Sequence, residues 1–126
     1  MLSAIRHLDY VVLLCDDIPR MKRFYHEQMG FPINRDWGTW VEMRVGSVIL
    51  ALRGRTRPYD GPSFQPGSAA VQLAFRVAPG EVDTCHAELI EREIEILEAP
   101  ISQEYGHRTL FFRDPEGNVL EIYAEL

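Results

Sequence analysis

The second half of this 126-residue sequence repeats the order of predicted elements found in the first half. Apolar segments at Leu8–Leu14 and Ala70–Val77 predict a strand at the start of each half. A helix and three further strands are predicted to follow each of these segments. A unit of this size does not cover both faces of a sheet by itself, so we expect the two units to pair.

Local signals place both helices. Asp16-Asp17-Ile18-Pro19 predicts the first helix start, because aspartate caps free N–H groups and proline needs none there. Gly30 is expected to end this helix, since a positive φ is cheap for glycine. Pro79-Gly80-Glu81 predicts the second helix start. Its predicted buried face consists of Val82, Cys85, Leu89 and Ile90.

Short strands are predicted after each helix, at Phe31–Asp36, Trp40–Val45, Val48–Arg53, Glu95–Glu98, Thr109–Arg113 and Val119–Ala124. Turn formers join the last two strands of each half, and aligning Gly46 with Gly117 places Leu50 over Glu121. Between the halves, the proline-, glycine- and arginine-rich segment Gly54–Gly67 predicts a linker or a loop over a site.

Two parts of the chain resemble a known family. Leu8–Leu13, followed by Asp17-Ile18, Phe24-Tyr25 and Gly30-Phe31, is similar to the opening of a vicinal-oxygen-chelate domain, the type found in glyoxalases, bleomycin-resistance proteins and ring-cleaving dioxygenases. Phe112–Ile122 resembles the ending of that domain. The resemblance implies an α+β fold. Two paired βαβββ modules would form a cupped, mostly antiparallel sheet with a helix behind each half.

The same resemblance implies how the chain is divided. Residues 1–126 would form a single glyoxalase/bleomycin-resistance-like domain. Its first module would span about residues 5–53, its linker about 54–68 and its second module about 69–126. Family members of this length usually form homodimers, so we expect a homodimer.

Metal-dependent members of this family hold a divalent ion with His or Glu from four strands. The resemblance maps those positions onto Tyr10, Leu50, Gln72 and Glu121. Only Glu121 keeps a ligand type of the family, since leucine has no donor and a phenol has a reference pKa of ~10. Zinc, nickel and iron favour imidazole, thiolate or several carboxylates. We therefore expect no resident metal or other cofactor, with a weakly bound divalent metal as the alternative.

Strand parity predicts a ligand pocket on the sheet face away from the helices. The predicted pocket residues are Tyr10, Leu50, Gln72, Arg76, Arg108, Glu121 and Tyr123, with His107 as a further candidate. Arg108 is included because it resembles an arginine that commonly precedes the family ending. Glu121 is expected to accept a hydrogen bond from Tyr10 or Gln72 and to pair with Arg76 or Arg108. A polar network that only satisfies itself is the alternative.

Two classes of function remain open at this point. The first is metal-free binding or sequestration of a small molecule, as the bleomycin-resistance resemblance implies. The second is a lyase-, isomerase- or dioxygenase-type enzyme that uses Glu121 as a general base or a weakly held divalent metal. Arginines at 53, 55, 57, 76 and 108 favour an anionic or oxygen-rich aromatic ligand.

Charge and composition exclude some partners. A formal net charge of −6 disfavours nucleic acid, because an acidic surface repels phosphate backbones. The sequence contains no apolar run near the ~20 residues that a membrane helix needs, and its start lacks the apolar stretch of a signal peptide. Cys15 and Cys85 lie far apart in apolar patterns, which predicts reduced thiols. We therefore expect a cytoplasmic location and no membrane partner.

Overall fold

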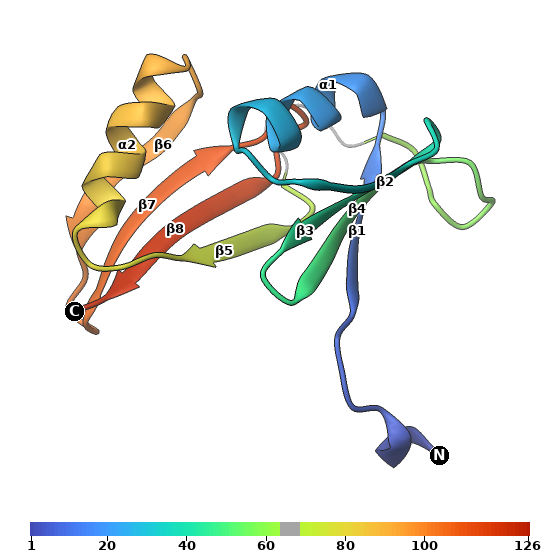
Figure 1. The fold of residues 1–126 in the computed structure, drawn as a ribbon, viewed down its shortest axis with the longest axis horizontal. Coiled ribbons are helices and arrows are strands. Elements are labelled where there is room, and N and C mark those ends of the chain that lie inside the picture. Colours follow the sequence, from blue (N-terminus) through green and yellow to red (C-terminus); the bar gives the residue numbers. More distant parts are fainter. Residues whose placement is uncertain (64–68) are drawn as a thin grey trace. The chain divides into compact units, whose positions relative to one another are not determined.

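The computed structural model describes residues 1–63 and 69–126 and divides the chain into two compact units, Met1–Ser63 and Phe64–Leu126. The first unit contains η1 (Leu2–Ala4), β1 (Tyr10–Cys15), α1 (Ile18–Lys22), η2 (Arg23–Gln28), β2 (Ile33–Asp36), β3 (Trp40–Val45) and β4 (Val48–Gly54) (Figure 1). The second unit contains β5 (Gln72–Arg76), α2 (Glu81–Glu91), β6 (Ile96–Ser102), β7 (His107–Arg113) and β8 (Val119–Glu125).

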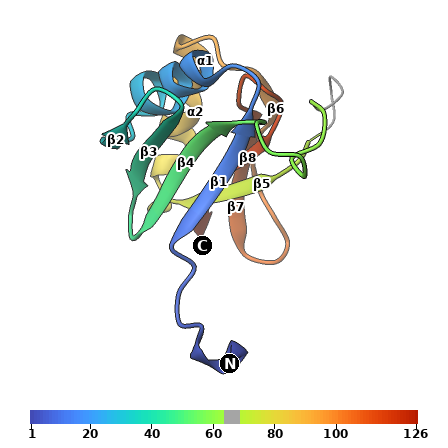
Figure 2. The same ribbon diagram turned by 90° about the vertical axis from the view of Figure 1, so that its right-hand side faces the viewer.

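The two sheets share one topology. Their strand orders are β1-β4-β3-β2 and β5-β8-β7-β6, so the first strand of each unit lies at an edge beside the last strand. Figure 2 shows β1 and β4 side by side. These two strands are parallel, as are β5 and β8, whereas the other pairs are antiparallel. The predicted α+β fold of two mostly antiparallel βαβββ modules is confirmed.

The first helix begins where the sequence predicts. The Asp17 side chain accepts a hydrogen bond from the backbone N–H of Arg20 at 3.0 Å, which caps α1. The helix then widens into the π-helical turn η2, whose last bond runs from the N–H of Met29 to the carbonyl of Phe24. Gly30 ends the segment with φ +80°.

The core of the first unit lies between its sheet and its helix. Met21 of α1 and Tyr25 of η2 are fully buried. The sheet residues buried in this unit include Leu13, Cys15, Val41, Met43, Leu50 and Leu52. Because pairs such as Leu13 with Leu52 are in register, these side chains point to the same side of the sheet. The apolar core therefore occupies one face of this sheet and does not include the side chains of the other face.

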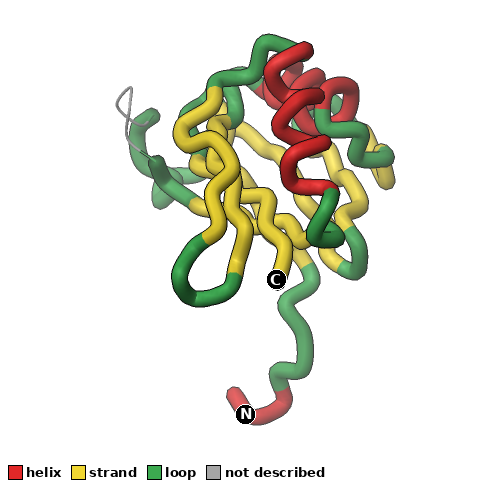
Figure 3. Tube along the Cα trace, turned by 90° about the vertical axis from the view of Figure 1, so that its left-hand side faces the viewer, coloured by secondary structure: helices red, strands yellow, loops and turns green. Residues whose placement is uncertain are grey.

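In the second unit, α2 packs against β6, β7 and β8, and Figure 3 shows this helix in red across the strands. Val82 and Leu89 are buried, as predicted. Ile90, however, was wrongly predicted to be buried and is 55% exposed. Leu89 follows Val82 by about two helical turns, whereas Ile90 is rotated by roughly 100° from that face. None of the helices within the described ranges has the length and hydrophobicity needed to cross a bilayer.

Candidate ligand-binding surface

We call the sheet face opposite the helix in each unit the open face. Residues in register on neighbouring strands point to the same side, so the pairings define this face. In the first unit it carries Tyr10, Val12 and Leu14 of β1, Ile49, Ala51 and Arg53 of β4, and Trp40, Glu42 and Arg44 of β3. In the second unit it carries Gln72, Ala74, Arg76, Thr109, Phe111, Glu121 and Tyr123.

Leu50 does not lie on the open face, so its predicted place beside Tyr10 is wrong. It is in register with Val11 of β1 and Met43 of β3, and it is only 3% exposed. Tyr10 is instead in register with Ile49. Leu50 is therefore a core side chain beneath the helix of its unit.

The cause of this error is a difference in turn length. The β3–β4 hairpin closes with Val45 opposite Val48, whereas β7 and β8 close with Arg113 opposite Val119. Aligning the turn glycines therefore places each residue of β4 one position away from its true equivalent in β8. The strand registers give the correct alignment. Tyr10 lies opposite Ile49 and Gln72 lies opposite Val119, so Ile49 corresponds to Val119. Two residues further along, Ala51 therefore corresponds to Glu121.

Glu121 lies half-buried on the open face of the second unit. Its Oε1 accepts a hydrogen bond from Nε2 of Gln72 at 3.4 Å, so the predicted contact between these two residues is confirmed. Gln72 itself is exposed. A carboxylate and an amide therefore lie together on a surface that small molecules can reach.

The predicted ion pair between Glu121 and an arginine is wrong. Arg76 lies on the open face but pairs with Glu125 at 3.1 Å. Arg108 is in register with Ala124, on the helix side of the sheet. There its guanidinium donates two hydrogen bonds of 2.8 Å to Asp83 of α2, which lowers the pKa of Asp83. Its predicted place in the pocket is therefore wrong as well.

An aromatic stack lies at one end of the second open face. The ring of Tyr123 stacks on His107 with centroids 4.8 Å apart and planes inclined by 24°. Tyr105 meets His107 edge-on, with ring centroids 5.2 Å apart. This places Tyr123 and the candidate His107 together, close to Arg76, which is in register with Tyr123.

Sequence reasoning missed a second carboxylate, Glu42, on the open face of the first unit. It is buried, and it accepts hydrogen bonds from Nε1 of Trp40 at 3.0 Å and from Nδ2 of Asn34 at 2.6 Å. These bonds, the Trp40 bond foremost, lower the pKa of Glu42, and a hydrogen bond from Tyr10 adds to them. The available signal was a lone acid between Val41 and Met43 in an apolar strand.

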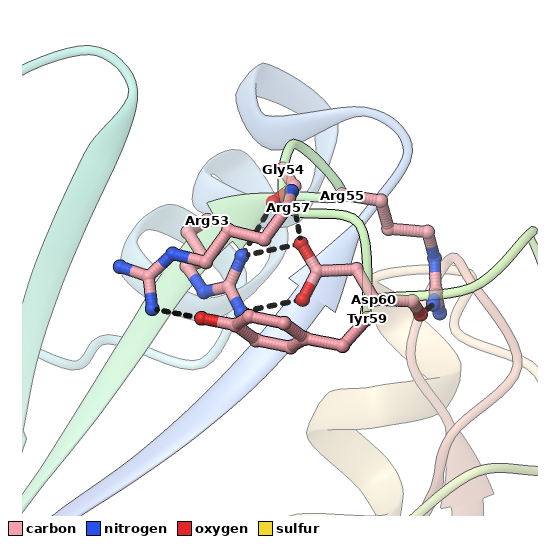
Figure 4. A network of polar contacts seen from close by, with 6 residues as sticks. All are labelled: Arg53, Gly54, Arg55, Arg57, Tyr59 and Asp60. Carbon is pink, nitrogen blue, oxygen red and sulfur yellow. Dashed lines mark hydrogen bonds and ion pairs between the residues drawn. The ribbon is translucent and has the colours of Figure 1, made fainter.

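The arginines at the end of β4 and just after it bind the loop that follows this strand (Figure 4). Arg53 donates two hydrogen bonds of 2.7 Å to the Asp60 carboxylate, and the backbone N–H of Arg57 donates a third at 2.8 Å. Arg55 donates to the backbone carbonyl of Asp60. These contacts hold the pKa of Asp60 far below its usual range. Asp60, which sequence reasoning missed, is thus the centre of a structural network.

The donors at the mapped positions fit a transition metal poorly. They are a phenol at Tyr10, an amide at Gln72 and one carboxylate at Glu121, and the corrected fourth position, Ala51, has no donor either. In residues 1–63 and 69–126, no group of three or more His, Cys, Asp or Glu side chains is arranged to hold a metal ion. Zinc and iron sites need more nitrogen, sulfur or carboxylate donors than this set supplies.

Two βαβββ units of matching topology, each with a helix on one face and a polar-aromatic open face, define the vicinal-oxygen-chelate class of fold. The family model described as the Glyoxalase/Bleomycin resistance protein/Dioxygenase superfamily matches residues 7–122. The chain belongs to this family.

Relatives of this chain include proteins of 23–24% sequence identity. A crystal structure of a glyoxalase/bleomycin resistance protein/dioxygenase from Nocardioides is similar with a TM-score of 0.85 at 23% identity, covering 97% of this chain and 85% of that one. Virulence protein STM3117 of Salmonella typhimurium is 24% identical, covering 94% of this chain and 83% of its own. Metallothiol transferase FosB of Staphylococcus epidermidis is 23% identical, covering 98% and 85%.

Proposed function

We propose that this protein binds a small anionic or oxygen-rich aromatic molecule on its open faces without a resident transition metal. The observation that carries this proposal is the make-up of the open face around Glu121. This face carries a carboxylate and an amide in contact, Glu121 and Gln72, and further along it a guanidinium and stacked aromatic rings, Arg76 and the Tyr123–His107 pair. Ligand sites typically combine apolar walls with a few convergent polar groups of this kind.

Each of these groups contacts or orients a different part of the ligand site. The Tyr123 and His107 rings offer a flat surface for an aromatic ring. Arg76 is 3.1 Å from Glu125 and largely exposed, so its remaining donors can meet an anionic or oxygen-rich substituent. The amide of Gln72 orients Glu121 through the 3.4 Å hydrogen bond.

The alternative is an enzyme, and one observation favours it. Glu121 has no arginine partner among the described residues and is half-buried, so it is free to accept a proton from a bound substrate. The name of the relative FosB, a metallothiol transferase, is in line with group-transfer chemistry elsewhere in the family. In this alternative Glu121 acts as the general base, or a divalent metal is weakly held.

A thermal-shift screen tests the proposal. The panel contains aromatic carboxylates and phenols, together with cationic and purely aliphatic compounds of similar size. We expect the first group to raise the Tm and the second group to have no effect. Stabilisation by cationic or aliphatic compounds alone would contradict the proposal.

Glu121→Gln separates the two functions, with Glu91→Gln as the control, since Glu91 is exposed on α2 of the same unit. For a binding protein, Glu121→Gln should weaken binding by about tenfold at most, because one hydrogen-bonding group is altered. Unchanged binding with complete loss of a turnover found in the wild type would establish the enzyme instead.

A further inference from the structure

The open face of the first unit holds an aromatic pair over a small residue. Tyr10 of β1 and Trp40 of β3 come from the two strands that flank β4, and their ring centroids are 6.4 Å apart with planes inclined by 52°. Between them on the same face lies Ala51, which is fully buried. The methyl group of Ala51 leaves room for the two rings to approach each other above β4.

Glu42 holds Trp40 in place from beside Ala51. It receives the Trp40 indole N–H and the Asn34 amide on separate oxygens. Glu42 is only 4% exposed, so a carboxylate with so many donors stays ionised and holds them in place. The Trp40 ring is thus tethered to Glu42, and the Tyr10 ring packs against Trp40.

The two units place a carboxylate in the same row of their open faces, but on different strands. Glu42 of β3 is in register with Ala51 of β4, whereas Phe111 of β7 is in register with Glu121 of β8. In this row, the first unit has its acid on β3 and its apolar residue on β4, whereas the second unit has its apolar residue on β7 and its acid on β8. The acid of the first unit is the one that is fully tied to donors, which suits a positioning role rather than proton transfer.

A cation lies beside the aromatic pair. Arg35 of β2 is in register with Glu42, and its Nε lies 4.0 Å from Glu42 Oε2. Its side chain is 58% exposed, and its guanidinium lies over the ring of Trp37 at 5.5 Å. At 4.0 Å the ion pair with Glu42 is loose, so Arg35 retains donors for a second anion.

We propose that Tyr10, Trp40 and Arg35 form a subsite for an aromatic carboxylate, with Glu42 as the positioning residue that holds the Trp40 ring, against which Tyr10 packs. Tyr10, 45% exposed, and Trp40 contact the ligand ring, and Arg35 contacts its carboxylate. This inference rests on the proposed binding function and names the ligand class for the first unit. Glu42 itself does not touch the ligand.

NMR of the indole N–H groups tests the subsite in the intact protein. The chain has two tryptophans, so Trp37→Phe assigns the Trp40 signal. The probes are benzoate and cyclohexanecarboxylate, which share a charge and a size but differ in aromaticity. We expect benzoate to shift the Trp40 signal at a concentration about tenfold below that needed for cyclohexanecarboxylate. Equal responses to the two probes, or none at Trp40, would overturn the subsite.

Glu42→Gln tests the positioning role. The amide nitrogen of glutamine cannot accept a hydrogen bond. Either the Trp40 indole N–H or the Asn34 amide therefore loses its acceptor. We expect a moved Trp40 N–H signal in the absence of ligand and about tenfold weaker benzoate binding. Glu27→Gln is the control, because Glu27 is exposed on η2, on the helix side of the same unit, and it should change neither readout.

Further outcomes keep this inference separate from the proposed function. Tyr10→Phe retains the ring and a folded site, so benzoate binding should weaken by no more than about threefold. Unchanged binding in Glu42→Gln would overturn the positioning role.

A benzoate response confined to Tyr123 and His107 would overturn the first-unit subsite while the proposed function stands. Failure of every aromatic compound in the thermal-shift panel would instead refute the proposed function.

Discussion

At the scale of single residues, the side chains at the family ligand positions decide the chemistry. Gln72 and Glu121 remain in contact at 3.4 Å, yet only Glu121 is a donor that transition metals favour. Tyr10 packs against Trp40, and Ala51 has no donor. The mapped positions thus hold a phenol, an amide, one carboxylate and a methyl group, which is why ligand binding is the function that we favour.

The first prediction tests the face assignment of Leu50. Leu50→Ala should lower the free energy of unfolding by about 2–5 kcal/mol, because it removes buried methyl groups and leaves a cavity in the core. The control is Ile49→Ala, at the neighbouring, partly exposed position on the open face, which should cost clearly less. Urea unfolding curves measure both values. A larger loss for Ile49→Ala would mean that Ile49, and not Leu50, faces the core.

At the scale of elements, most strands and both helix starts could be predicted, because alternation and capping are local signals. Trp40–Val45 is a strand with the predicted bounds, and Asp17 caps the first helix. What could not be predicted depends on registers between strands. Leu50 was assigned to the wrong face because the two hairpin turns differ in length.

Side-chain partners were harder to predict than elements. Arg108 has the same parity as Leu110 and Phe112, which face α2, and this signal could have placed it correctly. The partners of Glu42 and Asp60 come from other turns and strands, so no local pattern names them. Strand parity correctly placed Tyr10, Gln72, Arg76, Glu121 and Tyr123 on open faces, and their role in a binding site stays a prediction.

The second prediction concerns the loop after β4. Asp60→Asn should lower the Tm by several degrees at pH 7, since the carboxylate accepts the bonds from Arg53 and Arg57. The folded-state pKa of Asp60 is lowered, so its stabilisation is present above the ordinary aspartate value of ~3.9 and is lost as the pH falls through the lowered value.

Thermal unfolding from pH 7 to pH 2 measures this effect. The Tm values of wild type and Asp60→Asn should converge as the pH falls below about 4. Arg53→Lys should reproduce part of the loss at pH 7, because an ammonium group cannot form the two parallel bonds. A constant Tm difference at every pH would show that the Asp60 charge is not the cause.

At the scale of the whole molecule, the third prediction is a homodimer. The resemblance predicts it, and the N-terminal segment before β1 exposes large apolar side chains at Leu2, Ile5 and Leu8. Light scattering at micromolar concentration should give twice the chain mass of 14.5 kDa. A mass equal to one chain would refute this prediction. Serine at these three positions should shift the equilibrium towards the monomer.

The fourth prediction is that the protein binds its ligand without a resident transition metal. The measurement is a titration with an aromatic carboxylate that stabilises the protein, before and after treatment with a chelator, together with elemental analysis of the same samples. We predict well below one zinc, nickel, iron or manganese per chain and the same Kd in both titrations. About one metal ion per chain, with binding that is lost on chelation and restored by the metal, would contradict metal-free binding.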